Sequence, residues 1–383
     1  MNIIFISSQP YPIGMAGTKR IRLFAEYLAN KNVIVNLFTI SRSNHENDVS
    51  GVLNNVKYQF VRRRYYHILF GSRYLKHRIT DLFDKHDTNF IYVYGGINIE
   101  TKRLISYSIK LGYKIVLDLV EDYSLHNEKI RKRLALRYKL NTYLNQKMMH
   151  HVDGYIVISK YLKENLKSKN VNNRKIQLIP ISAGNLHFKP AGVDKRTNFR
   201  FLYTGTFGIK DGMDYMLTAY KKLYEKYKNV ELYLTGKVGI ISKNYKYLQE
   251  IDSTYNIKYL GTIPDNDYYN FLCNTDVLLM TRVYSEYANS GFPFKLGEYL
   301  ATGKPVIATA VSDITSYLKD NYDIVLAKPS NVQSLYKVME KVYLNYQDYI
   351  KIGVNGRNTA LKYFNPTENG KILSDFLNEI SSR

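Results

Sequence analysis

The chain has 383 residues, of which 45% are apolar, so it is too long for a single hydrophobic core and too apolar for a disordered or collagen-like protein. Its single cysteine, Cys273, excludes an internal disulfide and any metal site built from several cysteines. The net charge of +22 is concentrated in residues 1–185, which hold 30 of the 55 Lys and Arg but 13 of the 33 Asp and Glu. We therefore expect an anionic partner to meet the first half of the chain.

The first residues predict a buried β-strand and no targeting segment. Only residues 3–6 form a continuous apolar run, and no basic region precedes them, which argues against a signal peptide. No later stretch approaches the ~18 apolar residues that a membrane span requires. We expect a cytoplasmic protein that is still able to lie on a membrane surface.

Short β-branched runs alternate with helical stretches along residues 1–185. The predicted strands are NIIFIS, VIVNLFTI, VKYQFV, FIYVYG, YKIVLDL and GYIVIS, and two of the predicted helices span Lys19–Lys31 and Ser159–Lys169. Strands that alternate with helices in this way indicate βαβ units and a parallel sheet.

The same pattern begins again after a polar stretch centred on residues 184–198, which we interpret as a linker. The strands predicted beyond it are FRFLYTG, VELYLTG, IKYLG, DVLLM, PVIAT and DIVLA. The sequence thus predicts an α/β protein of two Rossmann-like, doubly wound domains, residues 1–185 and 186–365, with a C-terminal helix (366–383) that crosses back to the first domain. Ligands of such sheets bind outside the carboxyl ends of the strands, so we expect the site in a cleft between the domains.

A glycine-containing loop opens the second predicted domain. In FLYTGTFGIKDGMDYMLTAYKKL, Gly205 and Gly208 let the backbone approach a phosphate, and Gly212 opens the following helix. We predict that Lys210 contacts this phosphate, with a solvated lysine as the equal alternative.

The segment NSGFPFKLGEYLATGKPVIA (Asn289–Ala308) predicts a loop, a helix over residues 295–301 and a strand. Backbone amides at the start of the helix are able to hold a phosphate, and Lys295 adds a positive charge there. Glu298, one turn further on, is placed to accept hydrogen bonds from two sugar hydroxyls. From the residues alone, a surface glutamate on a packed helix is the favoured alternative.

The run PFKLGEYLATGKPVIA resembles the signature of the family 4 retaining glycosyltransferases, enzymes of the GT-B fold. The resemblance covers most of the chain, because the loop at Gly205 and the stretch YLGTIPDNDYYNFLCNTDVLLM occur with it in family order. It implies that Glu298 binds the ribose of a nucleotide-sugar and that Lys295 lies by its diphosphate. Many members carry another glutamate eight residues before Glu298, where this chain has Ser290. The donor-binding set that the resemblance implies is Gly17, Gly205, Thr206, Lys210, Gly261, Ser290, Phe294, Lys295, Leu296 and Glu298.

The segment VLDLVEDYSLH (Val116–His126) leads from a strand into the predicted cleft. The resemblance implies a residue near the reacting sugar here. Asp118, Glu121 and Asp122 are the candidates, with Glu121 favoured; a structural, cation-paired cluster of the three carboxylates is the alternative. Glu121, Asp118, Lys210 and Lys295 make up the predicted catalytic set. No aspartate motif of the metal-dependent type is present, so we expect no metal and an electrostatically stabilised diphosphate.

Two basic segments, Arg62–Arg78 and Lys129–Lys147, mix cations with Tyr and Leu. Basic amphipathic helices suit an anionic membrane surface, where each charge contributes about 1 kcal/mol. Solvated helix faces are the alternative. Nucleic acid is the other anionic partner considered, but no motif supports it, so none is expected.

The resemblance therefore implies a retaining glycosyltransferase that moves a sugar from a nucleotide-diphosphate-sugar, with UDP expected, to a lipid-linked or polysaccharide acceptor. Capsule or lipopolysaccharide synthesis at the inner face of a bacterial plasma membrane is the expected setting. One alternative is a non-catalytic sugar-nucleotide-binding subunit on the same fold, suggested by Ser290 and Thr206. A basic nucleic-acid-binding protein is the other.

Overall fold

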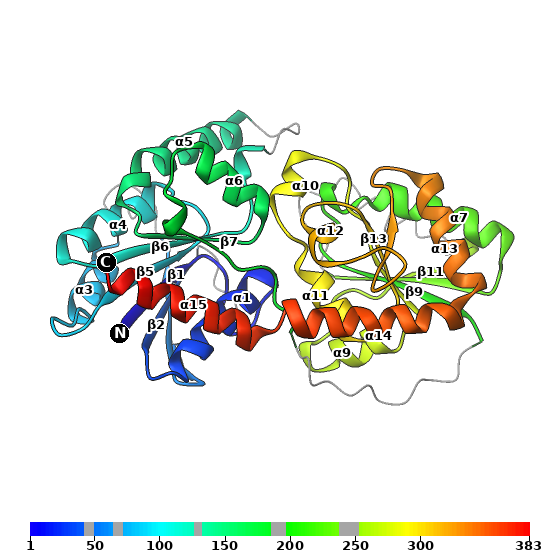
Figure 1. The fold of residues 1–383 in the computed structure, drawn as a ribbon, viewed down its shortest axis with the longest axis horizontal. Coiled ribbons are helices and arrows are strands. Elements are labelled where there is room, and N and C mark those ends of the chain that lie inside the picture. Colours follow the sequence, from blue (N-terminus) through cyan, green and yellow to red (C-terminus); the bar gives the residue numbers. More distant parts are fainter. Residues whose placement is uncertain (42–49, 64–71, 126–131, 185–196, 237–252) are drawn as a thin grey trace. The chain divides into compact units, whose positions relative to one another are not determined.

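The computed structural model describes residues 1–41, 50–63, 72–125, 132–184, 197–236 and 253–383, which form two compact units (Figure 1). Unit 1 comprises Met1–Pro180 and Pro366–Arg383, and unit 2 comprises Ile181–Asn365. The chain thus leaves unit 1 at Pro180 and returns to it with its C-terminal residues. Most of the predicted linker, and the domain boundary predicted after residue 185, lie outside the described ranges.

Unit 1 is built on an eight-stranded sheet with the order β3-β4-β2-β1-β5-β6-β7-β8. Neighbouring strands are parallel, except that β3 is antiparallel to β4. All six strands predicted for the first half are present. The strands are β1 (Asn2–Ser7), β2 (Ile34–Ser41), β3 (Gly51–Leu53), β4 (Val56–Arg62), β5 (Asn89–Tyr94), β6 (Lys114–Leu119), β7 (Gly154–Val157) and β8 (Ile176–Leu178).

Strand β3 is an addition to the predicted strands. It is joined to β4 by a tight turn at Asn54 and Asn55, whose φ angles are 48° and 65°. Two successive residues with positive φ fit a type I′ turn, which favours Asn at these positions. The Asn-Asn pair was the signal in the sequence for this hairpin.

The helices of unit 1 lie on both faces of its sheet, with α1 and α15 side by side on one face (Figure 1). Helix α15 packs Leu373, Phe376 and Leu377 into the same core as Phe24 and Leu28 of α1. The C-terminal helix is therefore part of the core of unit 1. The helices are α1 (Ala16–Ala29), α3 (Arg73–Asp81), α4 (Ile99–Leu111), α5 (Lys132–Met148), α6 (Lys160–Ser168) and α15 (Pro366–Ser381).

Helix α4 has strong local signals at both ends. The Asn98 side chain accepts hydrogen bonds from the amides of Glu100 and Thr101, while the Thr101 hydroxyl accepts one from the Asn98 amide. This reciprocal capping box fixes where the helix begins. At the other end Gly112, with φ 97°, stops it in the left-handed conformation that glycine tolerates.

Unit 2 is built on a fully parallel six-stranded sheet with the order β11-β10-β9-β12-β13-β14. Strand β9 lies between β10 and β12, so the strand order reverses at β9. Ligands of open α/β sheets bind at such a reversal, beyond the carboxyl ends of the strands. The strands are β9 (Phe199–Thr204), β10 (Val230–Thr235), β11 (Ile257–Tyr259), β12 (Val277–Met280), β13 (Val306–Thr309) and β14 (Val325–Ala327).

Helix α11, which carries the Lys295 segment, packs closely against α14. A Cβ at Gly353 would clash with the carbonyl oxygen of Gly303, just past the end of α11, and one at Gly356 would lie 2.8 Å from Leu300 Cδ2. The helices of unit 2 are α7 (Met213–Lys226), α9 (Asp265–Cys273), α10 (Glu286–Ser290), α11 (Phe294–Ala301), α12 (Ile314–Tyr317), α13 (Val332–Leu344) and α14 (Tyr346–Tyr363). None of the helices in the described ranges combines the length and apolarity needed to span a bilayer.

Candidate functional site

Unit 2 gathers cations around one buried carboxylate at the carboxyl end of β9. Asp211 lies in the loop after β9, where its Oδ2 accepts a hydrogen bond from the Gly208 amide (3.0 Å). The Nζ of Lys295, in the first turn of α11, lies 3.5 Å from Asp211 Oδ1 and donates to Tyr203 Oη (2.8 Å). Arg282, two residues beyond the end of β12, is also buried and acts electrostatically on Asp211.

The cluster holds three cations and one carboxylate. Burial disfavours the ionised form of Asp211, but Lys295, Arg282 and Lys210 outweigh this effect and keep the pKa of its carboxyl below the ordinary value. For Lys295 the unfavourable effects on the charged form are the larger ones. Burial and the two other cations outweigh the attraction of Asp211 and lower the pKa of Lys295 to about 8. Such an excess of positive charge favours an anionic ligand.

The guanidinium of Arg282 has an unused donor. Its Nε is buried without a hydrogen-bond partner in the described ranges, whereas Nη1 donates to the Ala288 carbonyl (3.4 Å). The backbone of Arg282 is held by Thr309, whose hydroxyl accepts from the Arg282 amide (2.8 Å) and donates to its carbonyl (2.7 Å). Buried donors almost always have partners, so an unpaired donor on a fixed arginine points to an anion as the natural ligand.

Glu298 lies one turn along α11 from Lys295 and is 8% exposed, so the surface-glutamate alternative is wrong. Tyr268 Oη on α9 donates to Glu298 Oε2 (3.1 Å) and lies 3.0 Å from Thr204 Oγ1. The Thr204 amide in turn donates to Tyr299 Oη (2.8 Å). Burial and the charge of Glu298 raise the pKa of Tyr268 well above its usual value, so Tyr268 stays a donor. The carboxylate is thus held between β9, α9 and α11.

Two of the predicted glycines shape the loops of unit 2. A Cβ at Gly205 would lie 2.6 Å from both Lys295 Nζ and Tyr203 Oη, so a side chain there would displace the lysine. Gly261 has φ 68°, in the region that favours glycine, and its carbonyl accepts from the Gly236 amide (2.7 Å). Both glycines follow the carboxyl ends of strands in one sheet.

Lys210, Thr206 and Ser290 occupy different surroundings. Lys210 Nζ lies 4.9 Å from the centre of the Tyr287 ring, and its charge acts on Asp211. Thr206 is exposed. Ser290 is fully buried and its Oγ donates to the Tyr287 carbonyl (2.9 Å), so in this conformation its hydroxyl is bonded within its own helix.

Phe294 and Leu296 flank Lys295 in the first turn of α11. Phe294 is half-buried, and Leu296 is fully buried. The first amides of a helix lack intrahelical partners, but the Leu296 amide already donates to the Pro293 carbonyl (3.0 Å). The structure therefore places Leu296 in the interior and does not bring it to the cation cluster.

In unit 1 the structure separates the two predicted catalytic carboxylates. Asp118 is fully buried and accepts hydrogen bonds from Arg20 Nε (2.8 Å), Arg20 Nη2 (3.0 Å) and Tyr92 Oη (2.7 Å). The cation-paired, structural alternative therefore describes Asp118, because a carboxylate enclosed in this way does not reach a substrate. Glu121 lies elsewhere, in the wall of a pocket.

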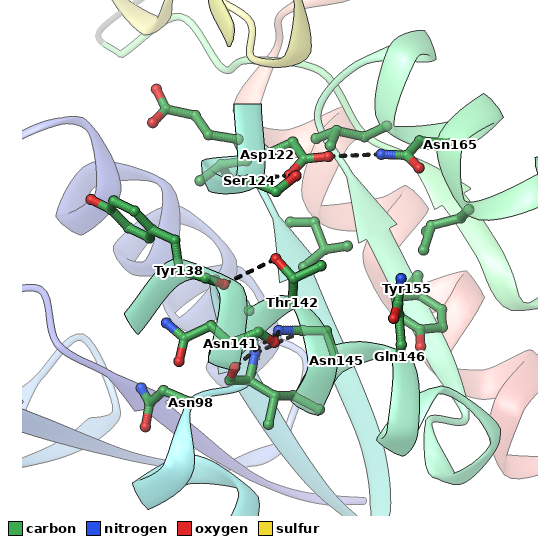
Figure 2. A pocket seen from close by; sticks show the side chains of 18 of the residues that line it. Asn98, Asp122, Ser124, Tyr138, Asn141, Thr142, Asn145, Gln146, Tyr155 and Asn165 are labelled. Carbon is green, nitrogen blue, oxygen red and sulfur yellow. Dashed lines mark hydrogen bonds between the residues drawn. The ribbon is translucent and has the colours of Figure 1, made fainter. Parts of the chain in front are cut away.

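This pocket in unit 1 has a volume of about 380 Å³ and is lined by the loops after β1, β5 and β6 together with α5 and α6 (Figure 2). Gly17 lies beside it, since a Cβ there would lie 2.9 Å from Gln9 Cδ and from Tyr94 Oη, two of the lining side chains. Glu121 and Gly17 are thus found at one pocket, while Asp118 is in the interior.

Sequence reasoning missed Arg282, Tyr203 and Tyr268. Arg282 had a signal, because it follows the predicted strand DVLLM, and the residues after a strand of an α/β sheet lie where ligands bind. Tyr203 and Tyr268 had none. Tyr203 lies inside a predicted strand, where tyrosine commonly packs in the core, and nothing in the stretch YLGTIPDNDYYNFLCNTDVLLM distinguishes Tyr268 from its neighbouring tyrosine.

The fold and these contacts define a protein of two Rossmann-like units with a cluster of cations around Asp211 in the second. Residues 187–359 match the family described as glycosyl transferases group 1. The chain is 24% identical over 220 residues to the uncharacterized glycosyltransferase MJ1178 of Methanocaldococcus jannaschii; the match spans 55% of this chain and about half (55%) of that relative.

Two solved structures are similar over nearly the whole chain. Sucrose-phosphate synthase from Thermosynechococcus elongatus has a TM-score of 0.77 and 16% identity over 99% of this chain and 98% of that one. Anabaena HepE, solved in complex with UDP-glucose, has a TM-score of 0.72 and 14% identity over 99% of this chain and 100% of that one. The chain has the GT-B fold, as predicted.

Proposed function

We propose that the protein is a retaining glycosyltransferase that moves a sugar from a UDP-sugar to a lipid-linked or polysaccharide acceptor in the synthesis of a capsule or lipopolysaccharide. The observation that carries the proposal is the cluster of Lys295, Arg282 and Lys210 around Asp211, where the strand order reverses. Within it, Arg282 Nε has no hydrogen-bond partner among the residues that the structure describes. The solved complexes of HepE with UDP and UDP-glucose support the choice of nucleotide.

In this proposal the diphosphate lies at the cation cluster. Negative charge develops on the leaving phosphate as the bond to the sugar breaks. Donors that are already fixed in place stabilise that charge most effectively, because they need no reorganisation during the reaction. Lys295 and Arg282 are fixed by Tyr203 and Thr309 respectively, and the proposal assigns no metal to this step. Glu298, held by Tyr268, accepts hydrogen bonds from the ribose hydroxyls.

Glu298→Ala is expected to weaken UDP binding about 10- to 100-fold, because hydrogen bonds to a charged group contribute roughly 1.5–3 kcal/mol. Thermal shift at increasing UDP measures this, since a ligand at about 100 times its dissociation constant stabilises by about 2.7 kcal/mol. Glu286→Ala, which removes an exposed glutamate on α10, is the matched control and should bind UDP like the parent protein.

Two results would contradict this proposal. Equal UDP binding by Glu298→Ala and the parent would remove Glu298 from the site. If UDP-, GDP-, dTDP- and ADP-sugars all fail to shift the melting temperature, the glycosyltransferase proposal is wrong. UDP-sugar binding without transfer or hydrolysis would favour the accessory-subunit alternative, to which Ser290 in place of a glutamate still points.

We also propose a peripheral contact between unit 1 and the inner, anionic face of the plasma membrane. Leu136, Leu140 and Tyr143 follow one another along one side of α5 and are 69%, 37% and 55% exposed. Exposed cations flank them at Arg137, Lys139 and Lys147. An apolar ridge between cations suits an anionic bilayer surface. Parts of both basic segments, residues 64–71 and 129–131, lie outside the described ranges.

Flotation on vesicles tests this contact. The protein should float with vesicles that contain phosphatidylglycerol and stay unbound with phosphatidylcholine alone. Combined replacement of Leu136, Leu140 and Tyr143 by serine should abolish flotation, because it removes the apolar ridge. The control replaces Ile350 and Val354, which are exposed on α14, by serine and should still float. If the two variants float equally well, α5 does not form the membrane contact.

A further inference from the structure

The carboxylate of Asp211 is fixed within the cation cluster of unit 2. Asp211 is 5% exposed, its Oδ2 accepts from the Gly208 amide (3.0 Å), and its backbone carbonyl accepts from Thr281 Oγ1 (3.0 Å). The carbonyl of Lys210 accepts from the Val283 amide (3.0 Å). These bonds tie the loop after β9 to the loop after β12. The carboxylate therefore stays in place and does not turn out to solvent when a ligand binds.

Phe207 makes the same loop rigid. Its φ of 55° is unfavourable for a bulky side chain, and its ring is fully buried. The ring packs against those of Tyr203 and Tyr259, with ring centres 5.6 and 5.8 Å apart. A residue keeps such a backbone conformation only where its surroundings hold it there. The position of Asp211 is thus set by the packing of unit 2 and not by its attraction to Lys295 alone.

Lys295 is held more firmly by Tyr203 than by Asp211. Its Nζ donates to Tyr203 Oη at 2.8 Å but lies 3.5 Å from Asp211 Oδ1, beyond the roughly 2.7–2.9 Å of a strong charge-assisted hydrogen bond. An ammonium has three donors, so Lys295 is able to keep Tyr203 and turn a donor towards an anion. A phosphate that binds there lies beside a carboxylate that does not move away.

The carboxylate of Asp211 opposes every phosphate that binds at the cluster. Like charges in a buried site repel strongly, because the effective dielectric constant there is low. The repulsion grows with the charge of the ligand. Free UDP carries more negative charge than the same UDP joined to a sugar, because its terminal phosphate has a second ionisable oxygen with a pKa of about 6. Asp211 therefore opposes UDP more strongly than it opposes a UDP-sugar.

We propose that Asp211 is a specificity-determining residue of the donor site, a fixed counter-charge that weakens the binding of the product UDP more than that of the UDP-sugar and so lets UDP leave after transfer. The inference rests on the proposed glycosyltransferase function and concerns the release of its product. Asp211 acts through its charge on the ligand and on Lys295.

Asp211→Asn removes this charge and keeps an oxygen that accepts from the Gly208 amide. In titration calorimetry at about pH 6.5, where the terminal phosphate of UDP is mostly doubly ionised, the variant should bind UDP about fivefold or more tightly than the parent protein. The gain should be smaller for UDP-glucose and absent for uridine, which has no phosphate.

Asp323→Asn is the matched control in unit 2. Asp323 is equally buried, at 5% exposed, and accepts from the Lys319 amide and the Thr359 hydroxyl (2.7 Å each). It precedes β14, whereas the cluster lies at the carboxyl ends of the strands. Its replacement should leave UDP affinity unchanged.

The pH profile separates a lost charge from a damaged loop. Asp211 raises the pKa of Lys295, whereas burial, Arg282 and Lys210 lower it. Tyr203, which also faces Lys295, stays protonated because burial raises its pKa well above the usual value. Without Asp211 the pKa of Lys295 should fall below about 8, so UDP affinity should decline from a lower pH than in the parent. A damaged loop would weaken binding at every pH.

The double variant Lys295→Met with Asp211→Asn serves if the single variant does not fold, because it removes both charges of the pair. It should bind UDP more tightly than Lys295→Met alone. Equal or weaker UDP binding after loss of Asp211 overturns the inference and leaves the proposed function intact, as long as the parent binds UDP. Equal gains for UDP and UDP-glucose overturn the selective effect on the product. A parent protein that binds neither UDP nor UDP-glucose overturns the inference together with the proposed function.

Discussion

Asp118→Ala is expected to lower the free energy of unfolding by about 3–5 kcal/mol, because it leaves the fully buried guanidinium of Arg20 without a counter-charge. Arg20 donates to both carboxylate oxygens of Asp118, to the Pro180 carbonyl (2.8 Å) and to the Ile179 carbonyl (3.1 Å). The pair therefore ties α1 and β6 to the last residues of the chain before it leaves unit 1.

Urea unfolding followed by circular dichroism measures this loss. Glu121→Ala is the matched control, because Glu121 lies three residues away in the pocket wall, and its replacement should change stability by much less. The double variant Arg20→Met with Asp118→Leu should recover part of the loss, because it removes the uncompensated charge. The recovery stays incomplete, because Tyr92 Oη and the carbonyls of Ile179 and Pro180 lose their partners. If Asp118→Ala is as stable as Glu121→Ala, the structural role given to Asp118 is wrong.

Asp118 shows a limit of prediction from the sequence: the strand that ends at this residue was predicted, but the burial of its carboxylate was not. The β-branched runs predicted the strands correctly, because each strand is specified by its own few residues. A carboxylate at the end of a strand is able to face a ligand or to be buried in the core. Which of the two occurs depends on the side chain that it bonds. Arg20 lies 98 residues away from Asp118, and the other acceptors of Arg20 lie about 160 residues away. No local pattern distinguishes a buried arginine on an amphipathic helix from a solvated one.

The site of unit 2 was predictable in part for the same reason. Lys295 and Glu298 lie in one helix, so their spacing in the sequence was enough to place them on neighbouring turns. Arg282 lies in the loop that follows β12, and it joins the cluster because the sheet order puts β12 beside β9. Tyr203 and Tyr268 hold Lys295 and Glu298 through contacts of 92 and 30 residues in separation. Those contacts follow from the packed structure alone.

Lys295→Met is expected to weaken UDP binding about 10- to 100-fold while making the unliganded protein more stable at pH 7. The loss of affinity is that of a charge-assisted hydrogen bond, roughly 1.5–3 kcal/mol. The gain in stability has a separate cause. Burial lowers the pKa of Lys295 to about 8, well below the ~10.4 of a lysine in an unfolded chain. Below pH 8 the folded parent protein therefore carries a buried ammonium beside two other cations. The Lys295→Met variant has no such charge there.

The same pKa sets the pH dependence. Between about pH 8 and 10.4 the unfolded chain binds more protons at Lys295 than the folded one does, so this residue makes the unliganded protein more stable as pH rises. UDP binding should change in the opposite direction. A diphosphate favours the protonated lysine, so affinity should be full below pH 8 and fall by up to about tenfold per pH unit above it. Titration calorimetry at pH 7 and 9.5 measures both affinities.

Lys295→Met should lose both the pH dependence of stability and the pH dependence of UDP affinity described above, since a thioether takes up no proton. Lys210→Met is the matched control at the same cluster and should keep the pH dependence, because Lys295 is still present. We expect stability and affinity to change in opposite directions because the repulsion that destabilises the unliganded protein is the one that a bound diphosphate relieves. Three cations repel one another while one carboxylate faces them, and the repulsion ends when an anion binds. Unchanged UDP affinity in Lys295→Met, or affinity in the parent that is flat across pH 8, would contradict the diphosphate assignment.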